Sequence, residues 1–562
     1  MKNHYLLAVK MNDRSVKNVL ANQCLDPSSP SYGVCELHTL GYITAEQGLG
    51  ETAALVMAYY TPESVYYKNE LLLRRSILAM RHTLSLQHED GTIDLPQTNF
   101  HCAPTVAFTF FHLGPAYKTM RRFSKHTPLE DEVEALLETY CQNSADGMIN
   151  CGFHTPNHRW VICAALSYCY NLLGREDCLE HIHRFLNEGM DCDEEGEYTE
   201  RSAGVYNTIC NEALMVMATE LDMPELLEHV KRNLRMVMKY IEPDGTINTL
   251  NSRRQDVGTS PSALRYYSNY LKMAMLTGDQ EFAWFADTMA ERQDALLTVD
   301  KPDGTPYCTF DNFLLNPEQF KLMASIEPVR PVLDYDKHFV ESGVVRWRRG
   351  DSTVTLIKGR PMFAKLQWGE HTAHLRLAGC FFARGQFAAQ TLEPIEGGYR
   401  LTFHDRWGYK RPLKEKPATS VWHNMDHSLR DSVTMQDYDL CVDVIFAADN
   451  RLELTIKASG CDRVPTKFEI LLQREGRYIR DEIELRMHGG DYLYHKGGTA
   501  RYEFNDHQSL TIEGGFYEHY YGEQMRGTLP VNNDSAFVVM TSYTPFEQKV
   551  SFTWTSRPEF PV

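Results

Sequence analysis

The chain has 562 residues, of which 43% are hydrophobic and 23% charged, a composition typical of a folded protein with more than one domain. Its net charge of −18 excludes the broad basic surface that general nucleic-acid binding requires. An acidic ligand would need a local cluster of cations, because charges are screened beyond about 8 Å at physiological salt.

The amino-terminal residues show no export signal. The apolar run at residues 5–9 is too short for a signal peptide, and no later stretch has the roughly 18 apolar residues of a membrane helix. The 14 cysteines form no C-x-x-C pair, which favours reduced and buried thiols. We therefore expect a cytoplasmic protein that binds neither membranes nor nucleic acid.

Residues 1–330 have the apolar spacing of helices. The clearest runs are residues 55–60, 71–86, 161–173, 213–221 and 264–276. A turn signature recurs between them every 49 to 59 residues, at Asp90-Gly91, Asp146-Gly147, Glu195-Gly196, Asp244-Gly245 and Asp303-Gly304. One helical hairpin with its loops fills such a period, and successive hairpins stack as a solenoid or close into an α/α toroid.

Residues 331–562 change to short runs typical of strands. Examples are residues 354–358, 399–403, 452–457, 467–472, 483–487 and 550–554. Many short strands without helical runs between them predict a β-sandwich. The proline-containing stretch 328–336 is the expected linker, so we predict a helical domain at 1–330 and a β-sandwich domain at 331–562.

The first candidate site opens the helical run that follows Thr155-Pro156. Threonine is a good N-cap and proline favours the first helical position, so Asn157 and His158 are expected in the first turn. A helix N-terminus attracts anions and disfavours imidazolium, which would keep His158 neutral and able to accept a proton. The alternative is that both residues only cap the helix.

The second candidate follows about one hairpin period later. Ser202 is the expected cap of the next helix, which places Tyr206 just inside it. Tyr206 lies 48 residues after His158, so the two side chains should face one cleft. Core packing of the tyrosine is the alternative.

The expected substrate contacts are mostly charged. Arg201, Arg253 and Arg254 would supply the positive charge that an acidic ligand needs, with Glu200 beside them. Trp160 would add an aromatic contact. For each arginine the alternative is an ion pair with a neighbouring acid.

Two histidines in the predicted sandwich, His371 and His374, form the third candidate. Residues three apart in a strand face opposite sides, so the two need not act together. No Asp or Cys at ligand spacing accompanies them, so we expect no cofactor, with a divalent metal as the alternative.

These segments resemble heparinase II/III-type polysaccharide lyases and the related alginate and oligo-alginate lyases. The resemblance rests on Asn157-His158, on residues 193–206 and on residues 339–347. It implies an α/α toroid catalytic domain, antiparallel β-sheets after it, and β-elimination at uronic acids of acidic oligosaccharides or polysaccharides without an organic cofactor.

The resemblance also implies roles for individual residues. Asn157 would neutralise the substrate carboxylate, while His158 and Tyr206 would transfer protons. His371, preferred to His374, would assist, and His374 would contact substrate. The family often has a His-x-His-x-Asp pattern leading to zinc, and the spacing of these two histidines departs from it.

Two other functions fit the sequence. A glycoside hydrolase on the same toroid would use paired carboxylates, for which Asp90, Asp94, Asp146 and Glu200 are available. The other is a carbohydrate-binding or scaffold protein without activity. The sequence leaves open which glycan is used, endo or exo action, and whether the chain forms a homo-oligomer.

Overall fold

The computed structural model describes residues 4–35, 42–297, 310–522, 524–530 and 534–556. Two compact units divide the chain, the first formed by residues 1–241 and 245–331, and the second by residues 242–244 and 332–562. The short segment Glu242–Asp244 thus groups with the second unit, whereas a division at residue 330 assigns it to the first. In the parts of the chain described, no helix combines the length and apolar character needed to cross a bilayer.

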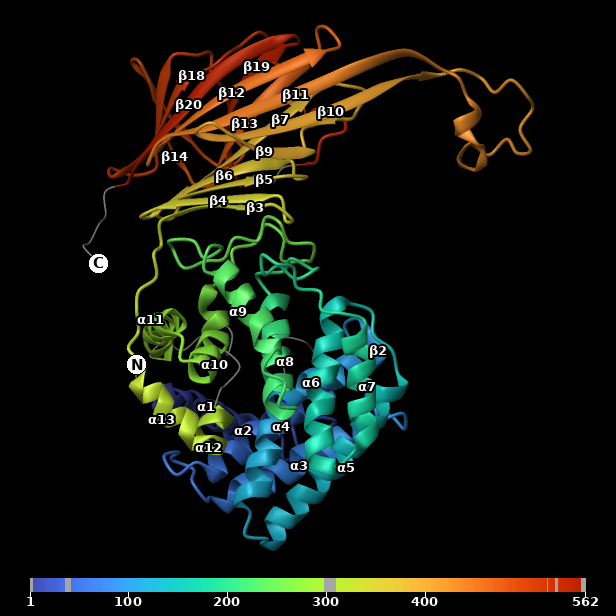
Figure 1. Ribbon diagram of the computed structural model, residues 1–562, viewed down its shortest axis with the longest axis vertical. Coiled ribbons are helices and arrows are strands. Elements are labelled where there is room, and N and C mark those ends of the chain that lie inside the picture. Colours follow the sequence, from blue (N-terminus) through green and yellow to red (C-terminus); the bar gives the residue numbers. More distant parts are fainter. Residues whose placement is uncertain (1–3, 36–41, 298–309, 523, 531–533, 557–562) are drawn as a thin grey trace. The chain divides into compact units, whose positions relative to one another are not determined.

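The first unit is a toroid of helical hairpins (Figure 1). Its inner helices are α2 (Ala45–Tyr60), α4 (Ala103–Phe123), α6 (Pro156–Leu173), α8 (Tyr206–Glu220) and α10 (Tyr267–Thr277), and the outer ones are α3 (Glu70–Leu86), α5 (Pro128–Asn150), α7 (Glu176–Asn187), α9 (Leu226–Val237) and α11 (Gln280–Leu297). Each inner helix packs on the next inner helix. The predicted α/α toroid is confirmed.

The first helix contacts the last hairpin and so closes the ring. In α1 (His4–Asn22), the imidazole of His4 lies 2.9 Å from the Tyr267 hydroxyl of α10 and 2.7 Å from the Asp287 carboxylate of α11. Two short helices, α12 (Phe310–Leu315) and α13 (Pro317–Ser325), end the unit. Its other elements are β1 (Ile93–Leu95), β2 (Asn99–Cys102) and the 3₁₀ turn η1 (Ala263–Tyr266).

The predicted glycine turns hold at three places and fail at one. Gly91, Gly196 and Gly245 have positive φ in turns that follow outer helices. Gly147 instead lies inside α5, which continues to Asn150. The glycine is needed there for close approach, because a Cβ atom would lie 2.9 Å from the Asp90 carbonyl oxygen and 2.8 Å from the Gly91 carbonyl carbon. The Asp303-Gly304 pair lies outside the described residues.

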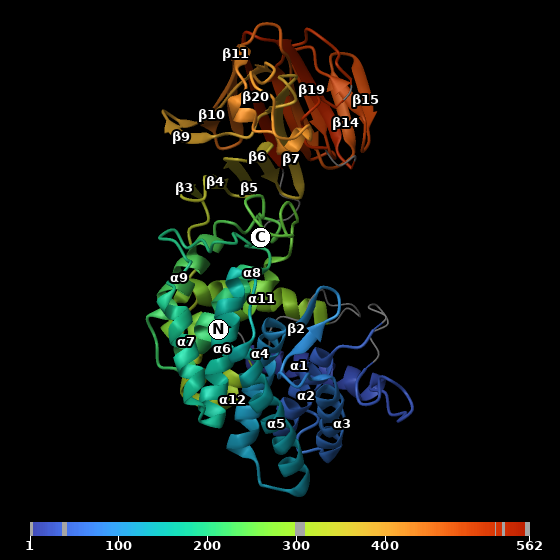
Figure 2. The same ribbon diagram turned by 90° about the vertical axis from the view of Figure 1, so that its right-hand side faces the viewer.

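The second unit is a sandwich of two sheets, as predicted (Figures 1 and 2). One sheet contains β9 (Thr391–Ile395), β10 (Gly398–Lys410), β11 (Ser432–Ala448), β12 (Arg451–Gly460), β14 (Gly476–Arg480), β15 (Ile483–Met487), β17 (Thr499–Glu503), β18 (Gln508–Gly514) and β20 (Phe546–Ser556). The other contains β3 (Tyr335–Phe339), β4 (Val344–Arg349), β5 (Ser352–Ile357), β6 (Met362–Trp368), β7 (His371–Gly379), β8 (Gly385–Gln386), β13 (Pro465–Leu472), β16 (Tyr492–Tyr494) and β19 (Ala536–Tyr543). Neighbouring strands are antiparallel except β16 and β19, which are parallel.

Alternation along the strands decides which side chains enter the sandwich core. Leu366 of β6 and Leu375 of β7 join the apolar cluster between the sheets. Lys365 and His374, their neighbours in sequence, face the other side of the sheet. There the buried Glu242 carboxylate lies 3.2 Å from Lys365 Nζ.

Strands β10 and β11 extend beyond the sandwich as a two-stranded ribbon (Figure 1). Pairing of β10 with β9 ends at Thr402, and pairing of β11 with β12 begins at Tyr438. We call residues 403–437 the arm and residues 410–430 the arm tip, which includes η2 (Trp422–Asn424) and η3 (His427–Leu429). In Figure 2 the arm is viewed end-on.

Candidate active site

Asn157 and His158 lie in the first turn of α6, as the Thr-Pro pair predicts. Thr155 is the N-cap residue with extended backbone, Pro156 starts the helix, and the Thr155 carbonyl accepts from the His158 amide at 3.1 Å. The Thr155 hydroxyl does not cap the helix backbone; it accepts from Asn157 Nδ2 at 3.2 Å. Both Asn157 and His158 are buried, with 0% and 8% exposure.

Glu200 links Asn157 to an arginine from another loop. Its carboxylate accepts from Asn157 Nδ2 at 2.8 Å and from Arg254 Nη1 at 2.7 Å. Burial raises the pKa of the Glu200 carboxyl, and the bonds from Asn157 and the charge of Arg254 oppose that rise. Glu200 therefore holds two hydrogen-bond donors in place, one neutral and one cationic.

Tyr206 lies beside the same arginine. The Arg254 guanidinium lies over the Tyr206 ring, 4.6 Å from its centroid, and Nη2 lies 3.5 Å from the tyrosine hydroxyl. Gln255 Nε2 donates to that hydroxyl at 2.7 Å. The predicted position is correct, because α8 begins at Tyr206, although Val205 occupies the cap position and Ser202 Oγ accepts from the Tyr206 amide at 3.2 Å.

His158 is kept neutral by its surroundings. Burial, with the nearby His154 and Arg254, lowers the pKa of the His158 imidazole to about 4. The ring stands edge-on to His154 and to Phe108, with centroids 4.9 and 6.0 Å away. Its Nδ1 is buried without a hydrogen-bond partner among the described residues.

Asp256 connects the loop that carries Glu200 to the loop that carries Arg254 by hydrogen bonds. Its buried carboxylate accepts from Ser202 Oγ at 3.0 Å, from the Gly204 amide at 3.0 Å and from Ser252 Oγ at 2.5 Å. The Arg253 amide also donates to the Glu200 carbonyl at 3.1 Å. We call Asn157, His158, Glu200, Tyr206 and Arg254 the cluster. Hydrogen bonds between the two loops therefore hold Glu200 and Arg254 in place.

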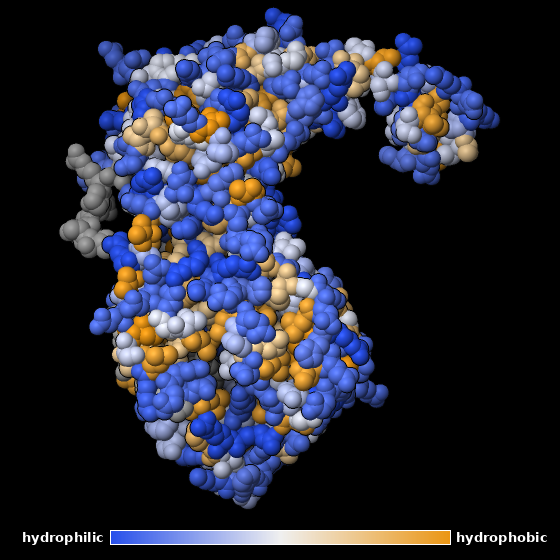
Figure 3. Space-filling view, in the orientation of Figure 1, coloured by the Kyte–Doolittle hydropathy of each residue, from blue (hydrophilic) through white to orange (hydrophobic). Residues whose placement is uncertain are grey.

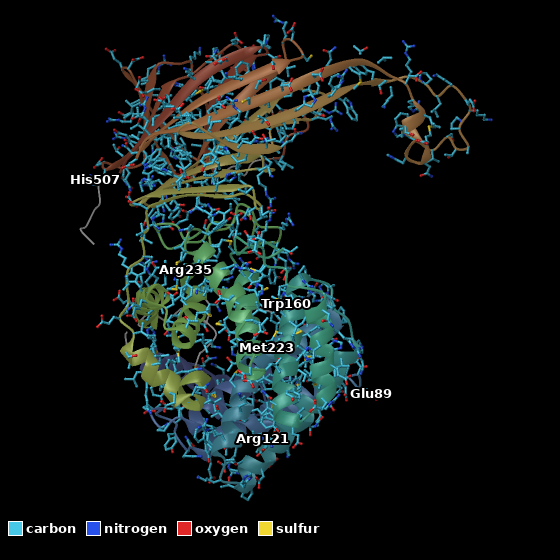
Figure 4. All side chains as sticks on the ribbon, viewed as in Figure 1. Glu89, Arg121, Trp160, Met223, Arg235 and His507 are labelled. Atoms are coloured by element: carbon cyan, nitrogen blue, oxygen red, sulfur yellow. The ribbon has the colours of Figure 1, made fainter. Side chains whose placement is uncertain are left out.

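The other predicted substrate-binding residues of the first unit, Arg253, Arg201 and Trp160, range from exposed to fully buried. Arg253 is exposed, with Nη1 3.4 Å from the Thr199 carbonyl. Arg201 is half-buried with a positive φ of 51°, and its charge opposes the burial that raises the pKa of Glu197 to about 7. Trp160 is labelled in Figure 4. It does not suit stacking on a sugar, because it is fully buried and its indole donates to Asp191 at 2.7 Å.

In the second unit, His371 lies between the two sheets of the sandwich. It stacks on Phe504 with ring centroids 4.4 Å apart, and its Nε2 lies 2.5 Å from Gln508 Oε1 of the facing sheet. The strand alternation turns His371 inward, so this placement does not support the predicted preference for His371 over His374.

His374 lies on the opposite face of the same strand, as expected for residues three apart. Burial and the Lys365 ammonium lower the pKa of His374 to about 3, so its imidazole is neutral. Among the described residues, a metal-ligand type of grouping occurs at His126, Asp131 and Glu134 beside the start of α5, and includes neither His371 nor His374.

Sequence reasoning missed two residues that shape the cluster, Gln255 and Asp256. Both directly follow Arg254, so the segment was visible in the sequence. Their contacts were not, because each reaches a residue about 50 positions earlier, and only the folded loops bring such residues together.

No family model and no curated protein matches the sequence. Solved structures do match. A heparinase III aligns over 98% of this chain and 84% of its own, with a TM-score of 0.55 and 10% identity. A heparan sulfate lyase mutant from Pedobacter heparinus aligns over 92% and 77%, with a TM-score of 0.52 and 10% identity.

A xanthan lyase from Paenibacillus aligns over 99% of this chain and 57% of its own, with a TM-score of 0.51 and 10% identity. The chain has the polysaccharide lyase fold. At identities near 10%, the polysaccharide lyase fold is what these proteins share with the chain, and the reaction has to be argued from the side chains.

Proposed function

We propose that this protein is a lyase that cleaves uronic-acid-containing oligosaccharides or polysaccharides by β-elimination. The observation that carries the proposal is the position of Arg254. Its guanidinium lies against Tyr206, is paired with Glu200 and is close enough to His158 to lower the pKa of that imidazole. Tyr206 and the neutral His158 thus each interact with the same cation.

The chemistry needs a carboxylate to be neutralised. The hydrogen at C5 of a uronic acid is weakly acidic because the adjacent carboxylate is already negative. Hydrogen bonds and positive charge on that carboxylate stabilise the enolate-like intermediate. Arg254 and Asn157 would supply them, with the longer Asn157–Thr155 bond the one that the substrate replaces.

Two proton transfers complete the elimination. Neutral His158 removes the C5 proton, and the electron pair of the C5–H bond forms the C4–C5 double bond. The C4–O4 bond breaks, and its electrons leave with O4. The Tyr206 hydroxyl gives its proton to the departing O4. Glu200 acts as a positioning residue that orients Asn157 and Arg254, and no step is assigned to His371 or His374.

Asp90, Asp94 and Asp146 suit hydrolysis less well than Glu200, whose pKa burial raises. A hydrolase needs a general acid with a raised pKa. Hydrogen bonds from Thr92 and His101 hold the pKa of Asp90 at about 2 despite desolvation, and bonds from His101 and His88 lower that of Asp94. Asp146 pairs with Arg175 at 2.7 Å, and Glu200 is already bound by Asn157 and Arg254.

A screen of uronate glycans tests the proposal. Elimination creates a C4–C5 double bond that absorbs ultraviolet light, whereas hydrolysis creates reducing ends without it. We expect ultraviolet-absorbing products from at least one uronate glycan, and none from the same glycan after carboxyl reduction. Reducing ends without that absorbance would establish a hydrolase, and binding without products would establish a non-catalytic protein.

A further inference from the structure

The arm lacks a core of its own. No residue between Leu401 and Tyr438 is buried, although all of them are described. Gln390 and Cys461 still bond to the backbone at the base of the arm, at His404 and Asp437, but no described strand pairs with either edge of the ribbon beyond them. A two-stranded ribbon alone is marginally stable in water, since ordering each residue costs about 1–2 kcal/mol.

The arm nevertheless displays large apolar side chains. Val421, Trp422 and Leu429 at the tip have exposures of 53%, 58% and 66%, and Tyr409 on the ribbon has 61%. Figure 3 shows an apolar patch on the rounded tip, within a hydrophilic surround. Exposed patches of this kind mark surfaces that another molecule covers.

The arm tip also differs in charge from the rest of the protein. It carries five cationic residues, Lys410, Arg411, Lys414, Lys416 and Arg430, against two acidic ones, Glu415 and Asp426. Its net charge is therefore +3, which leaves −21 on the rest of the chain. Only the cation of Lys414 is paired with a nearby acid, Asp431, among these described residues.

From these observations we propose that the arm tip docks on the acidic body of a second copy of this chain. Trp422, Met425 and Arg430 are the residue types enriched at the centres of protein interfaces, and the Arg430 guanidinium lies 4.9 Å from the Trp422 ring. The tip meets a body of opposite charge, whereas two tips of +3 would repel each other. Reciprocal docking of both arms gives a closed twofold dimer.

Sedimentation of the full chain at about 1–100 µM tests the proposal. We expect a dimer that dissociates toward about 1 M salt, where screening shortens to about 3 Å. Trp422→Ser with Leu429→Ser should weaken dimerisation by about tenfold or more. Arg411→Glu with Lys416→Glu, which changes the tip charge from +3 to −1, should weaken it too and remove much of the salt dependence.

The matched control is Ile483→Ser with Leu485→Ser, two apolar residues of β15 with 56% and 43% exposure. This variant should remain dimeric. All variants should keep the wild-type melting temperature at high salt, because the arm contributes no buried residue. A monomeric wild type over the whole range, or a dimer that the tip variants leave intact, would overturn the proposal; a monomer whose tip binds heparin would assign the arm to acidic glycans instead.

Discussion

The hydroxyl of Tyr206 is the atom on which the proposed elimination most depends. Tyr206→Phe removes that oxygen and leaves the ring under Arg254, so the fold should be retained. We expect kcat to fall by about 10²–10⁴, because O4 would leave without a proton. Steady-state assays of ultraviolet-absorbing product provide the measurement.

Tyr409→Phe is the matched control, since Tyr409 is an exposed tyrosine of the arm. It should retain wild-type turnover. Wild-type turnover in Tyr206→Phe would remove Tyr206 from the mechanism.

Asn157 should act mainly on the transition state. Asn157→Ala deletes a donor to the substrate carboxylate, whose extra charge develops only as C5 loses its proton. We expect kcat to fall by about 10²–10³ with a smaller change in KM. A large rise in KM at unchanged kcat would instead assign Asn157 to ground-state binding.

The pH dependence should report His158. Because its folded pKa is lowered to about 4, the base stays neutral and active far below the ordinary imidazole pKa. The acid limb of log kcat/KM should therefore lie near pH 4, and activity should persist at pH 5 to 6. A limb near 6.5 would contradict the assignment.

The sign for stability is the same, since the lowered pKa gives stability that is complete above about 6.5 and lost as the pH falls toward 4. Circular dichroism across this range separates unfolding from titration. Glu197 acts in the opposite sense, because its pKa is raised from 4.5 to about 7. Its contribution to stability is complete below about pH 4.5 and is lost as the pH rises to 7, and Glu197→Gln should remove that loss.

The Thr155-Pro156 pair was enough to predict that Asn157 and His158 lie in the first turn of their helix, because it is a local signal. Tyr206 does begin its helix as predicted, although Val205 and not Ser202 is the cap residue. The bonds from Glu200 to Asn157 and Arg254 could not be predicted, since they depend on how two long loops cross. The burial of Trp160 and the inward position of His371 could not be predicted either, because residue type does not reveal which way a side chain faces.

Among the secondary structure elements, α5 offers a direct test of packing against propensity. Gly147→Ala should stabilise a helix by up to about 1 kcal/mol from propensity alone. Here the added methyl group would lie against the backbone at Asp90 and Gly91, so we expect destabilisation by about 1–3 kcal/mol. Denaturant unfolding gives the free energy of unfolding.

Gly50 of α2 is the matched control, because among the described residues no atom outside its own helical turn lies within 4 Å of its added Cβ atom. Gly50→Ala should be neutral or stabilising. Stabilisation by both substitutions would contradict this prediction, because it would show that the backbone at Gly91 can move to accommodate the added methyl group of Gly147→Ala.

Element types were predictable in both halves, since helical and strand periodicities are properties of the sequence itself. The Asp146-Gly147 prediction failed because Asp-Gly is only a preference for turns. The arm was not predicted either: its alternating ribbon resembles any hairpin, and only the pairing shows that β10 and β11 continue past their neighbours.

At the scale of the whole molecule, loss of the Glu242 carboxylate should cost much stability. It is fully buried, with Arg346 Nη2 at 2.9 Å, Lys365 Nζ at 3.2 Å and Thr353 Oγ1 at 2.7 Å. Glu242→Gln removes the buried carboxylate that Arg346 and Lys365 share, so we expect a loss of about 3–5 kcal/mol. Thermal and denaturant unfolding provide the measurement.

Glu484→Gln, which removes an exposed partner of Arg477, is the control and should cost less than about 1 kcal/mol. Burial of Glu242 opposes ionisation, but Arg346 and Lys365 lower its pKa overall. Its contribution is therefore complete above about pH 4.5 and lost in acid, so the difference between wild type and Glu242→Gln should shrink as the pH falls. An unchanged difference in acid would refute the charge argument.

Because Glu242–Asp244 belongs to the second unit, the order of synthesis affects how that unit folds. Synthesis runs from the amino terminus, so Glu242 is made about a hundred residues before Arg346 and Lys365. The sandwich then pairs Arg346 and Lys365 only with a segment that precedes it by about a hundred residues in the sequence. Residues 332–562 expressed alone would lack this carboxylate, so an excised sandwich should be a poor folder, and co-expression with residues 1–331 should rescue it.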